Sequence, residues 1–456
     1  MRSLKGKRVV VMGLGLFGGG VGAVRFLCRE GARVTVTDLR PASDLKESLE
    51  KLDGCSVSLK LGGHDEADFQ SADLIVANPG VPRSSAFLKL AEAAGVPVTT
   101  EICLFMERCP APMVGVTGSS GKTTTTSLLV EMVRRHHPET FVGGNIGASL
   151  LGQLDRMGEE TPVILELSSF QLDYLGDLSW SPKVAVVTNF APNHLDIHGS
   201  LEAYRRAKYQ IVAYQREDGV AVVNADDAEV NGWVREGDSR RFAFGLDTKS
   251  VPGIFLDTNE ICYQDIGPVQ TLCGVEEIRL TGRHNLANVL AASGAALKMG
   301  VPTQKIVEAV REFSGVAHRL ERVAEVEGIT YYNDSIATSP DRTCVALEAF
   351  SGRVVLIAGG YDKGLVFDSL GPVIAEKVCD LILIGKTGDA IADAVPQDGR
   401  VAFHRAETLE DAVYVAKSVA QNGDVVLLSP ASASYDMFRN FEERGERFKQ
   451  LVCERL

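Results

Sequence analysis

The sequence predicts an α/β protein built from three consecutive domains, and three observations support this class. Short β-branched runs such as RVVVMG, ARVTVTD and ADLIVANPG alternate with helical stretches from Lys7 onward, and each run ends in a polar or glycine-rich turn. This alternation is typical of parallel strands joined by crossover helices. The chain has 456 residues, which is too long for one hydrophobic core. A cluster of prolines near residue 110 also interrupts the pattern.

The interruptions predict where the domains begin and end. The prolines separate a first unit from a new strand at Met113–Val116. The second unit continues through VILEL, VAVVTNF and GVAVVN, then a weaker antiparallel-looking stretch over residues 241–280 and an alanine-rich helix from about 285 to 299. The segment EFSGVAHRLERV is interpreted as a linker to a third unit, with strands in ITYYNDS, RVVLIAGG, LILIG and DVVLLSP. The predicted domains are residues 1–109, 110–315 and 316–456.

Composition argues against several classes of function. Acidic residues outnumber basic ones, giving a formal net charge of -13, which disfavours binding to nucleic acid or to an anionic membrane surface. Nine cysteines form no CxxC pair or Cys/His ligand spacing, which indicates reduced thiols. No signal segment opens the chain, and no apolar run reaches the ~18 residues of a membrane helix. We therefore expect a cytoplasmic protein with no membrane insertion and no nucleic-acid partner.

The strongest local signal is VGVTGSSGKTTTT, where a strand leads into glycines and then into lysine and threonine at the start of a helix. Glycines let backbone N–H groups turn toward phosphate oxygens, and the helix N-terminus adds its dipole. In such a loop Lys122 reaches the β- and γ-phosphates of ATP, and the Thr123 hydroxyl binds Mg²⁺. The spacing departs from GxxxxGK[ST], since Val116 replaces the first glycine and Gly118 supplies the turn. The alternative is a tight strand-to-helix turn with an incidental lysine.

The first domain has a second glycine motif, GLGLFG, directly after the run RVVVM. Gly13, Gly15 and Gly18 complete the pattern GxGxxG, and Asp38 ends the next predicted strand. This arrangement is typical of a Rossmann-like domain that binds NAD or FAD, although the same backbone accepts any nucleotide diphosphate. A chain with both motifs is more simply interpreted as holding two nucleotides, one as energy source and one as part of the substrate. Glycines that serve only helix–strand packing are the alternative.

Two side chains of the central domain are predicted at the carboxyl edge of its sheet, where open α/β sheets build their sites. Glu166 ends the run VILE, and His194 follows VAVVTNF, with Asn193 and Asp196 beside it. Glu166 is therefore a candidate Mg²⁺ ligand, and His194 is either its partner or a structural or solvated histidine. Lys208, in LEAYRRAKYQI, has no chemical signature of its own, and a solvated or salt-bridged lysine is the simpler interpretation.

Three predicted strand ends of the third domain carry loops rich in hydroxyls, glycine and single charges. Their sequences are YYNDSIATSP, IAGGYDKG and LLSPASASYDMF. Because binding residues often lie on loops held by a rigid scaffold, we interpret them as recognition loops. Simple loop decoration is the alternative.

These motifs resemble those of the Mur ligases, in the same order. TGSSGKTT, GGNIG, ELSSFQL, NHLD, YRRAKYQI, GRHNLANVLAA, AHRLE, NDSIATSP, GGYDK and SPASASYDMFRNFEERGERF together span essentially the whole chain. The last motif looks like that of the D-glutamate-adding branch, and the DNPR motif of the diaminopimelate- or lysine-adding branch is absent. The resemblance implies a monomeric ATP-dependent ligase of peptidoglycan synthesis with two Mg²⁺ ions. It would add D-glutamate to UDP-N-acetylmuramoyl-L-alanine through an acyl phosphate.

The resemblance also implies binding roles for individual residues. In the N-terminal Rossmann-like domain, the UDP moiety would contact Leu16, Phe17, Asp38, Arg40 and Gly80. The muramoyl diphosphate would contact Asn145, Ser168 and Gln171. In the central P-loop ATPase-type domain, ATP would lie against Gly118, Ser119, Ser120, Gly121, Lys122, Thr123, Thr124, Asn285 and Asn288, with Arg319 and Asp334 near its ribose. In the C-terminal Rossmann-like domain, D-glutamate would contact Thr338, Lys363, Ser434 and Phe441.

The implied catalytic residues are Lys122, Glu166, His194 and Lys208, and the implied metal ligands are Thr123, Glu166, His194 and Lys208. Lys208 matches the family's carbamylated lysine, which reverses the simpler interpretation given above. An unmodified lysine titrates near ~10.4 and binds cations poorly. A carbamate is an anion, so it can help to hold a second Mg²⁺.

Two positions depart from the family pattern. Many relatives have a lysine in the DSxAT loop where this chain has Ile336, and relatives often have an acid at the position of Asn193. The first change removes a cation near glutamate or phosphate, and the second removes a negative charge beside the metal site.

Three other interpretations stay open. A related ligase could add L-glutamate to the same UDP-sugar or to a folate. An NAD-dependent dehydrogenase would explain GLGLFG and Asp38 but not TGSSGKTT. A regulatory nucleotide-binding module would keep the glycine loops without needing Glu166, His194 and Lys208, and all three are present.

Overall fold

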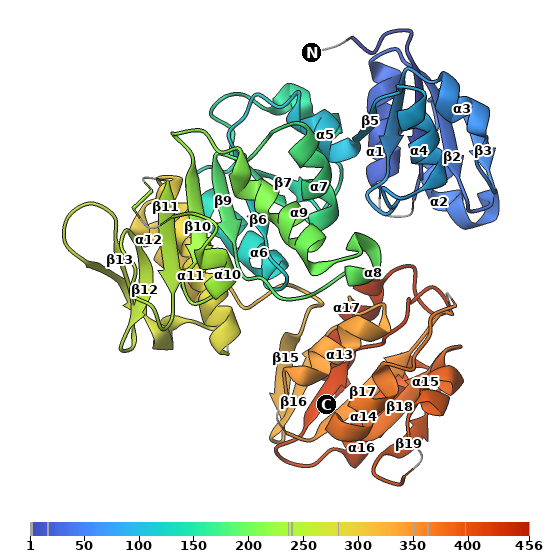
Figure 1. The fold of residues 1–456 in the computed structure, drawn as a ribbon. Coiled ribbons are helices and arrows are strands. Elements are labelled where there is room, and N and C mark those ends of the chain that lie inside the picture. The colour runs from blue at the N-terminus through green and yellow to red at the C-terminus, as the bar shows by residue number, and fades with distance from the viewer. Residues whose placement is uncertain are drawn as a thin grey trace. The chain divides into compact units, whose positions relative to one another are not determined.

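The computed structural model describes residues 3–15, 18–235, 237–238, 240–280, 282–350, 352–362, 364–396 and 398–455. Helices accompany three sheets, which follow one another along the chain from blue to red in Figure 1. Residues 1–313 form one compact unit with the first two sheets, and residues 314–456 form a second unit with the third. The predicted α/β class is confirmed.

The first sheet is parallel, with strand order β3-β2-β1-β4-β5. Its strands are β1 (Arg8–Met12), β2 (Arg33–Asp38), β3 (Val57–Leu61), β4 (Leu74–Ala77) and β5 (Val98–Thr100), and its helices are α1 (Gly19–Arg29), η1 (Ala42–Leu45), α2 (Lys46–Glu50), α3 (Glu66–Ser71), α4 (Ala86–Ala93) and α5 (Glu101–Met106). Val9 and Val11 pack in one hydrophobic cluster and Val10 and Met12 in another. Both faces of β1 are therefore buried, which explains its uninterrupted apolar run. The strand order reverses between β1 and β4, which is where open α/β sheets usually bind their ligands, at the carboxyl ends of the strands.

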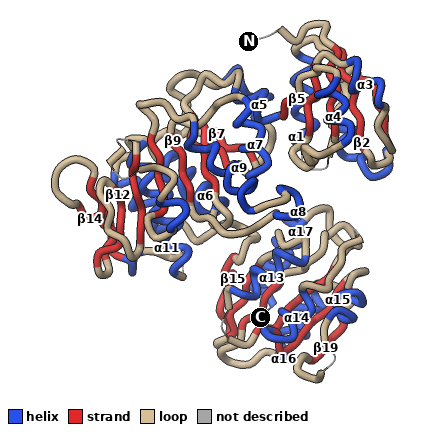
Figure 2. Tube along the Cα trace, in the orientation of Figure 1, coloured by secondary structure: helices blue, strands red, loops and turns tan. Residues whose placement is uncertain are grey.

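The second sheet has the order β14-β13-β12-β11-β10-β9-β6-β8-β7. Its strands are β6 (Met113–Thr117), β7 (Phe141–Gly144), β8 (Val163–Glu166), β9 (Val184–Val187), β10 (Val220–Asn224), β11 (Arg241–Gly245), β12 (Gly253–Asp257), β13 (Glu260–Gln264) and β14 (Gln270–Gly274). Its helices are α6 (Lys122–Arg134), η2 (Leu150–Arg156), α7 (Ser169–Asp177), α8 (Leu195–His198), α9 (Leu201–Ala213), α10 (Ala228–Asn231), η3 (Val275–Glu277), α11 (Arg283–Lys298) and α12 (Thr303–Glu312). Helices α6 and α11 pack on one face and α7 and α9 on the other, so the central strands are covered on both sides (Figure 2).

The antiparallel stretch predicted over residues 241–280 is wrong for its first half. Strand β11 pairs parallel with β10, and β12 pairs parallel with β11; only β13 and β14 are antiparallel to their neighbours. Parallel neighbours usually need a crossover of a dozen or more residues. Here residues 246–252 alone join β11 to β12, which is shorter than a usual parallel crossover.

The third sheet has the order β15-β16-β20-β17-β18-β19, and only the β15–β16 pair is antiparallel. Its strands are β15 (Glu321–Val326), β16 (Ile329–Asn333), β17 (Val354–Gly359), β18 (Val378–Ile384), β19 (Ala402–Arg405) and β20 (Val425–Leu428). Its helices are α13 (Pro340–Glu348), α14 (Leu370–Lys377), α15 (Gly388–Ala394), α16 (Leu409–Val419) and α17 (Phe441–Arg455). The predicted linker EFSGVAHRLERV is wrong at its end, because its last three residues already belong to β15. Strand β15 lies at the edge of the sheet and is only partly buried. The charged side chains of Glu321 and Arg322 therefore interrupt the apolar pattern by which a strand is usually predicted.

Among the described residues, no helix combines the length and the apolar character needed to cross a bilayer. The nine cysteines are free thiols. The folded units therefore depend on their apolar cores, which line both faces of each sheet.

Candidate active site

The phosphate loop connects β6 to α6, and two of its glycines are required by geometry. Gly121 has φ 76°, a left-handed conformation that residues with a side chain rarely adopt. A Cβ at Gly121 would overlap Asn288 Oδ1, and a Cβ at Gly118 would overlap Thr188 Oγ1. The loop can therefore lie against its neighbours only without these side chains.

Strand β9 ends beside this loop and fixes its path. Ser120 N donates to Asn189 Oδ1 (2.9 Å), and Thr188 Oγ1 donates to Ser120 O (2.6 Å). Ser119 Oγ donates to Ala191 O (2.8 Å). Thr188 and Asn189 were not among the predicted site residues, although they come immediately after the apolar run VAVV and so lie at the predicted edge.

The lysine of the loop is already directed at its backbone. Lys122 Nζ donates to Gly118 O (2.9 Å) and to Ser119 O (3.2 Å). Lys122, Thr123 and Thr124 occupy the first turn of α6, so the positive end of the helix dipole lies at the same place. This combination of lysine, backbone N–H groups and dipole suits a phosphate group.

The candidate adenine residues lie next to this turn. Asn288, in α11, accepts a hydrogen bond from Thr125 Oγ1 at 3.3 Å, and its Nδ2 donates to Asn285 Oδ1 at 3.3 Å. The structure therefore brings Asn288 to the phosphate loop from a helix more than 150 residues away in the chain, and Asn285 is hydrogen-bonded to it.

Glu166, at the end of β8, fits a cation. Its side chain is 1% exposed. Its Oε1 accepts from Asn145 Nδ2 at 2.7 Å, whereas Oε2 is buried with no hydrogen-bond partner among the described residues. A buried carboxylate oxygen without a partner is costly unless a positive group satisfies it. Glu166 can therefore act as a metal ligand, with Asn145 orienting it.

Lys208, on α9, is buried rather than solvated. It is 2% exposed; its Nζ donates to Gly118 O (2.8 Å) and lies 4.9 Å from the centre of the Tyr204 ring. Burial, and then the charge of Lys122, lowers the pKa of Lys208 well below its usual value, while Glu166 opposes the shift. The simple interpretation of a solvated or salt-bridged lysine is wrong, because α9 packs this side chain beneath the phosphate loop.

His194 precedes α8 in a left-handed conformation, with φ 52°. Its ring lies 5.3 Å from that of Phe170 and 6.4 Å from that of Tyr204, between centroids. Phe170 also stacks on His198 at 5.1 Å. His194 thus stands beside the start of α7 and the helix that carries Lys208.

Among the described residues, no group of three or more His, Cys, Asp or Glu side chains is arranged to hold a metal ion. Glu166 and His194 alone would therefore leave a metal short of ligands. The remaining ligands would have to come from Thr123, a modified Lys208 and phosphate oxygens, which suit the hard cation Mg²⁺.

Ser168 and Gln171 lie at the start of α7 and form its capping box. Gln171 N donates to Ser168 Oγ at 3.3 Å, and Ser168 N donates to Gln171 Oε1 at 3.0 Å. The cap lies at the start of the helix that follows β8, the strand that ends at Glu166.

The first domain holds its glycine loop through Asp38. This residue is 5% exposed, and its carboxylate accepts from Gly15 N at 3.2 Å and from Arg40 N at 3.0 Å. The predicted UDP-contacting residues Leu16 and Phe17 lie outside the described residues. The carboxylate therefore shapes the loop that is predicted to bind the diphosphate.

Asn78, which the sequence analysis did not single out, joins the loops that follow β1 and β4. Its Nδ2 donates to Gly13 O at 3.3 Å, and its Oδ1 accepts from Gly80 N at 3.1 Å. Asn78 directly follows β4, where the strand order reverses. This position is the feature by which it could have been predicted as a site residue.

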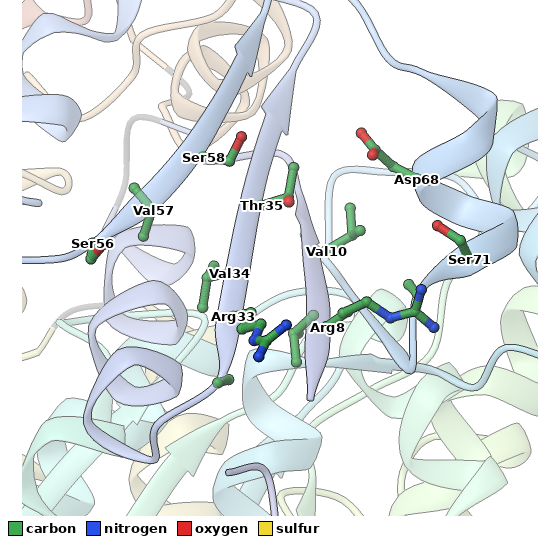
Figure 3. Close-up of a pocket in the computed structure, with 13 residues that line it drawn as sticks. Arg8, Val10, Arg33, Val34, Thr35, Ser56, Val57, Ser58, Asp68 and Ser71 are labelled. Atoms are coloured by element: carbon green, nitrogen blue, oxygen red, sulfur yellow. The ribbon is translucent and has the colours of Figure 1, made fainter. Parts of the chain in front are cut away.

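The first domain contains a cavity of about 570 Å³, and Figure 3 shows residues that line it. Arg8 and Arg33, the first residues of β1 and β2, line it together with Ser71 of α3. It therefore opens near the amino ends of the strands, whereas Asp38 lies at the carboxyl end of β2. The candidate nucleotide site is elsewhere.

In the second unit, Asp334 follows β16 and is buried. Burial raises the pKa of Asp334 to about 7, although hydrogen bonds from Ser429 Oγ (2.8 Å) and Leu320 N (3.2 Å) lower it in part. Arg319 precedes Leu320 in the chain and also lowers this pKa through its charge. The predicted pair of Arg319 and Asp334 is therefore brought together.

The candidate D-glutamate residues of the second unit lie on neighbouring loops. Thr338 belongs to the loop after β16 and Ser434 to the loop after β20, while Phe441 begins α17. Ser335 Oγ donates to Phe441 O at 2.8 Å, which ties the first loop to the helix. Lys363 lies outside the described residues.

Together, the parallel sheets, the phosphate loop and the second glycine loop define an α/β enzyme that binds nucleoside phosphates. The family models identify its family. Residues 7–100 match the Mur ligase MurD-like N-terminal domain, residues 116–296 the Mur ligase middle domain and residues 318–432 the Mur ligase glutamate ligase domain. The chain belongs to the Mur ligase family and is an ATP-dependent ligase.

Similar proteins cover the chain from end to end. A UDP-N-acetylmuramoylalanine–D-glutamate ligase of Roseiflexus sp. is 42% identical, over 98% of this chain and 99% of its own length. A protein of the same name from Symbiobacterium thermophilum is 41% identical, over 98% of both chains. The solved UDP-N-acetylmuramate-alanine ligase of Thermotoga maritima has a TM-score of 0.55 at 18% identity, over 98% of this chain and 99% of that one. This last likeness concerns the fold.

Proposed function

We propose that the chain joins D-glutamate to UDP-N-acetylmuramoyl-L-alanine and converts ATP to ADP and phosphate. The two relatives described above, which match almost their whole length to this chain, carry the name of that reaction. The observation that carries the proposal is the meeting of Lys122 and Lys208 at the carbonyl of Gly118, beneath a phosphate loop. A dehydrogenase or a passive nucleotide-binding module has no use for this arrangement.

The chemistry explains why a phosphate loop is needed. A carboxylate is a poor acyl donor, because its leaving group would be oxide. Transfer of the γ-phosphoryl group of ATP to the alanyl carboxylate gives an acyl phosphate, whose leaving group is phosphate. Lys122 and the N–H groups of the loop hold the phosphoryl oxygens while charge spreads over them, so catalysis is mainly positioning and electrostatics.

The second half of the reaction forms the amide bond. The unprotonated amine of D-glutamate attacks the acyl carbon, and collapse of the tetrahedral intermediate releases phosphate. Thr338, Lys363, Ser434 and Phe441 would hold the amino acid. Arg319 and Asp334 would lie at the ribose of ATP, with Asn285 and Asn288 near its adenine.

Mg²⁺ would supply positive charge to the triphosphate and to the transferring group. Thr123, Glu166, His194 and a carbamylated Lys208 would hold two such ions. The fit rests on the buried, unpartnered Oε2 of Glu166 and on the environment of Lys208. Carbamylation needs an unprotonated amine, and the lowered pKa of Lys208 favours that form.

The first domain would bind the UDP moiety in a site at the carboxyl ends of β1 and β4. Leu16, Phe17, Asp38, Arg40 and Gly80 would line it, and Asn145, Ser168 and Gln171 would contact the muramoyl diphosphate. We propose the domain limits 1–109, 110–315 and 316–456, and a monomer that acts in the cytoplasm.

One assay tests this function. Phosphate release from ATP is measured with UDP-N-acetylmuramoyl-L-alanine and either D-glutamate, L-glutamate or no amino acid. We expect release with D-glutamate only, together with a product heavier by one glutamyl group. Equal or faster release with L-glutamate, or release that needs a folate instead of the UDP-sugar, would reject the proposed substrates. Oxidation of NADH by the same protein would favour the dehydrogenase.

A further inference from the structure

Arg444 is a fully buried cation whose four hydrogen-bond contacts are to neutral groups. It lies in the first turn of α17 with 0% exposure. Its Nε donates to Ser335 Oγ (2.9 Å) and its Nη2 to Ser335 O (3.0 Å) and Ser432 O (3.1 Å). Its Nη1 donates to Ala433 O at 3.3 Å. No carboxylate of the described residues forms an ion pair with it within 4.0 Å, and Asp436 acts only through its charge at longer range.

This arrangement is poorly suited to stability alone. Burial lowers the pKa of Arg444 to about 9, so the folded state carries the cost of a desolvated charge. Even buried ion pairs can often be replaced by apolar side chains of similar volume without loss of stability, and Arg444 has no such ion pair among the described residues. A guanidinium at this position therefore calls for a role that an apolar side chain cannot fill, which is to hold several acceptors at once with its rigid fork of donors.

The groups that Arg444 joins belong to two loops almost 100 residues apart. Ser335 lies in the loop after β16, which carries Thr338, and Ser432 lies in the loop after β20, which carries Ser434. Ser335 Oγ also donates a hydrogen bond to Phe441 O (2.8 Å). From the first turn of α17, Arg444 thus contacts each of the two loops, and Ser335 also bonds to Phe441 at the start of the same helix.

The third recognition loop, which follows β17, is bonded to the same carbonyl group as Arg444. Ala433 O accepts from Tyr361 N at 2.8 Å as well as from Arg444, and Thr387 Oγ1 lies 2.7 Å from Ser432 Oγ. Tyr361 stands in the loop after β17. The loop after β20 is also strained, since Ala431 has φ 55° without being a glycine. Such a conformation persists only where its surroundings hold it.

We propose that Arg444 is a positioning residue for the amino-acid substrate, setting the relative placement of the three loops of the second unit. This inference rests on the proposed function for the identity of that substrate, D-glutamate. It does not require Arg444 to touch the substrate. The loops carry the contacting groups, and the guanidinium keeps them at a fixed spacing.

Steady-state kinetics of Arg444→Met in the full-length enzyme test this inference. Loss of charge-assisted hydrogen bonds that hold the pocket is expected to raise KM for D-glutamate about tenfold or more. KM for ATP and for UDP-N-acetylmuramoyl-L-alanine should stay close to wild type. Arg447→Met is the matched control, because Arg447 lies on the same helix but pairs with Glu410 (2.6 Å between Nε and Oε1). A folded Arg444→Met enzyme with an unchanged KM for D-glutamate would overturn the inference.

Hydrogen–deuterium exchange separates this inference from the proposed function. Backbone amides of residues 334–338 and 431–436 should exchange faster in Arg444→Met than in Arg447→Met, with no substrate present. If wild type shows no turnover with D-glutamate, the proposed function fails, and the loop exchange still decides the role of Arg444. If Arg444→Met does not fold, Ser335→Ala takes its place, because it removes one acceptor and leaves the cation. Unchanged exchange and an unchanged amino-acid KM in that variant would also overturn the inference.

Discussion

Lys122 and Lys208 donate hydrogen bonds to the same carbonyl oxygen, that of Gly118, with Nζ–O distances of 2.9 and 2.8 Å. Two ammonium groups at one acceptor repel each other, and Lys208 is the more deeply buried of the two. Burial is the main cause of the lowered pKa of Lys208, and the charge of Lys122 is the second. The pair therefore combines a cation for phosphate with an amine that is ready to be modified.

We predict that Lys208→Ala lowers kcat by at least about a hundredfold, since it removes the amine whose carbamate is proposed to hold Mg²⁺ at a site of charge development. The wild-type protein, kept in bicarbonate, should gain the mass of one CO₂ on a peptide that contains Lys208. Lys305→Ala is the control, because Lys305 is a surface lysine paired with Glu308 at 2.9 Å. Full activity of Lys208→Ala would contradict the assigned role, whatever the mass spectrum shows.

Lys122→Ala should abolish turnover, because each charge-assisted hydrogen bond to a phosphate contributes ~1.5 to 3 kcal/mol. Fluorescent-nucleotide titration should show weaker ATP binding, while binding of the UDP-sugar stays unchanged. Lys122→Arg keeps the charge but changes its shape, so it should recover only part of the activity. A wild-type rate in Lys122→Ala would refute the phosphate-loop assignment.

Much of the fold could be predicted from the sequence, because buried parallel strands have apolar runs that end in polar turns. The predicted strands at RVVVM and VAVV are β1 and β9, and the alanine-rich helix is α11. The failures are β12 and β15. The first is joined to β11 by a short connection without a helix, and the second is a partly exposed edge strand with charged side chains. Neither feature has a strong local signal.

The site was only partly predictable, for a different reason. Glu166 ends β8 and His194 lies in the segment that follows β9, so the rule that sites form at carboxyl edges found them. The burial of Lys208 depends on how α9 packs against the phosphate loop, and the hydrogen bonds of Arg444 depend on loops far away in the chain. Such long-range contacts have no local pattern, and only the resemblance to the family indicated Lys208.

Glu166→Gln should raise the Mg²⁺ concentration needed for half-maximal activity by about tenfold or more, because it removes a full negative charge from a cation site. The amide oxygen can still accept from Asn145, so the fold should be retained. Glu101→Gln is the control, because the Glu101 carboxyl also accepts from a neighbouring side chain, Ser149 Oγ at 2.5 Å, in another part of the unit. An unchanged Mg²⁺ requirement in Glu166→Gln, measured by phosphate release, would exclude Glu166 as a ligand.

Asp334 should make the second unit less stable as the pH rises through its titration range. Its pKa is raised from 3.8 to about 7 in the folded chain. Between these values the folded state keeps a proton that the unfolded state has released. Stability is therefore highest below pH ~4 with respect to this group and falls by up to about 1.4 kcal/mol per pH unit until pH ~7.

Asp334→Asn removes this titration while keeping a side chain of similar size. The difference in unfolding midpoint between Asp334→Asn and wild type should therefore shift in favour of the variant between pH 5 and pH 8, measured by differential scanning calorimetry without ligands. Asp393→Asn, at an exposed position of α15, should show no such shift. Bound ATP would add its own interactions at the proposed ribose site. The difference in unfolding midpoint between Asp334→Asn and wild type should therefore change when ATP is present. A constant difference across the pH range would mean that Asp334 is already ionised at pH 5 in the folded protein, and that its partners Ser429 and Leu320 outweigh burial.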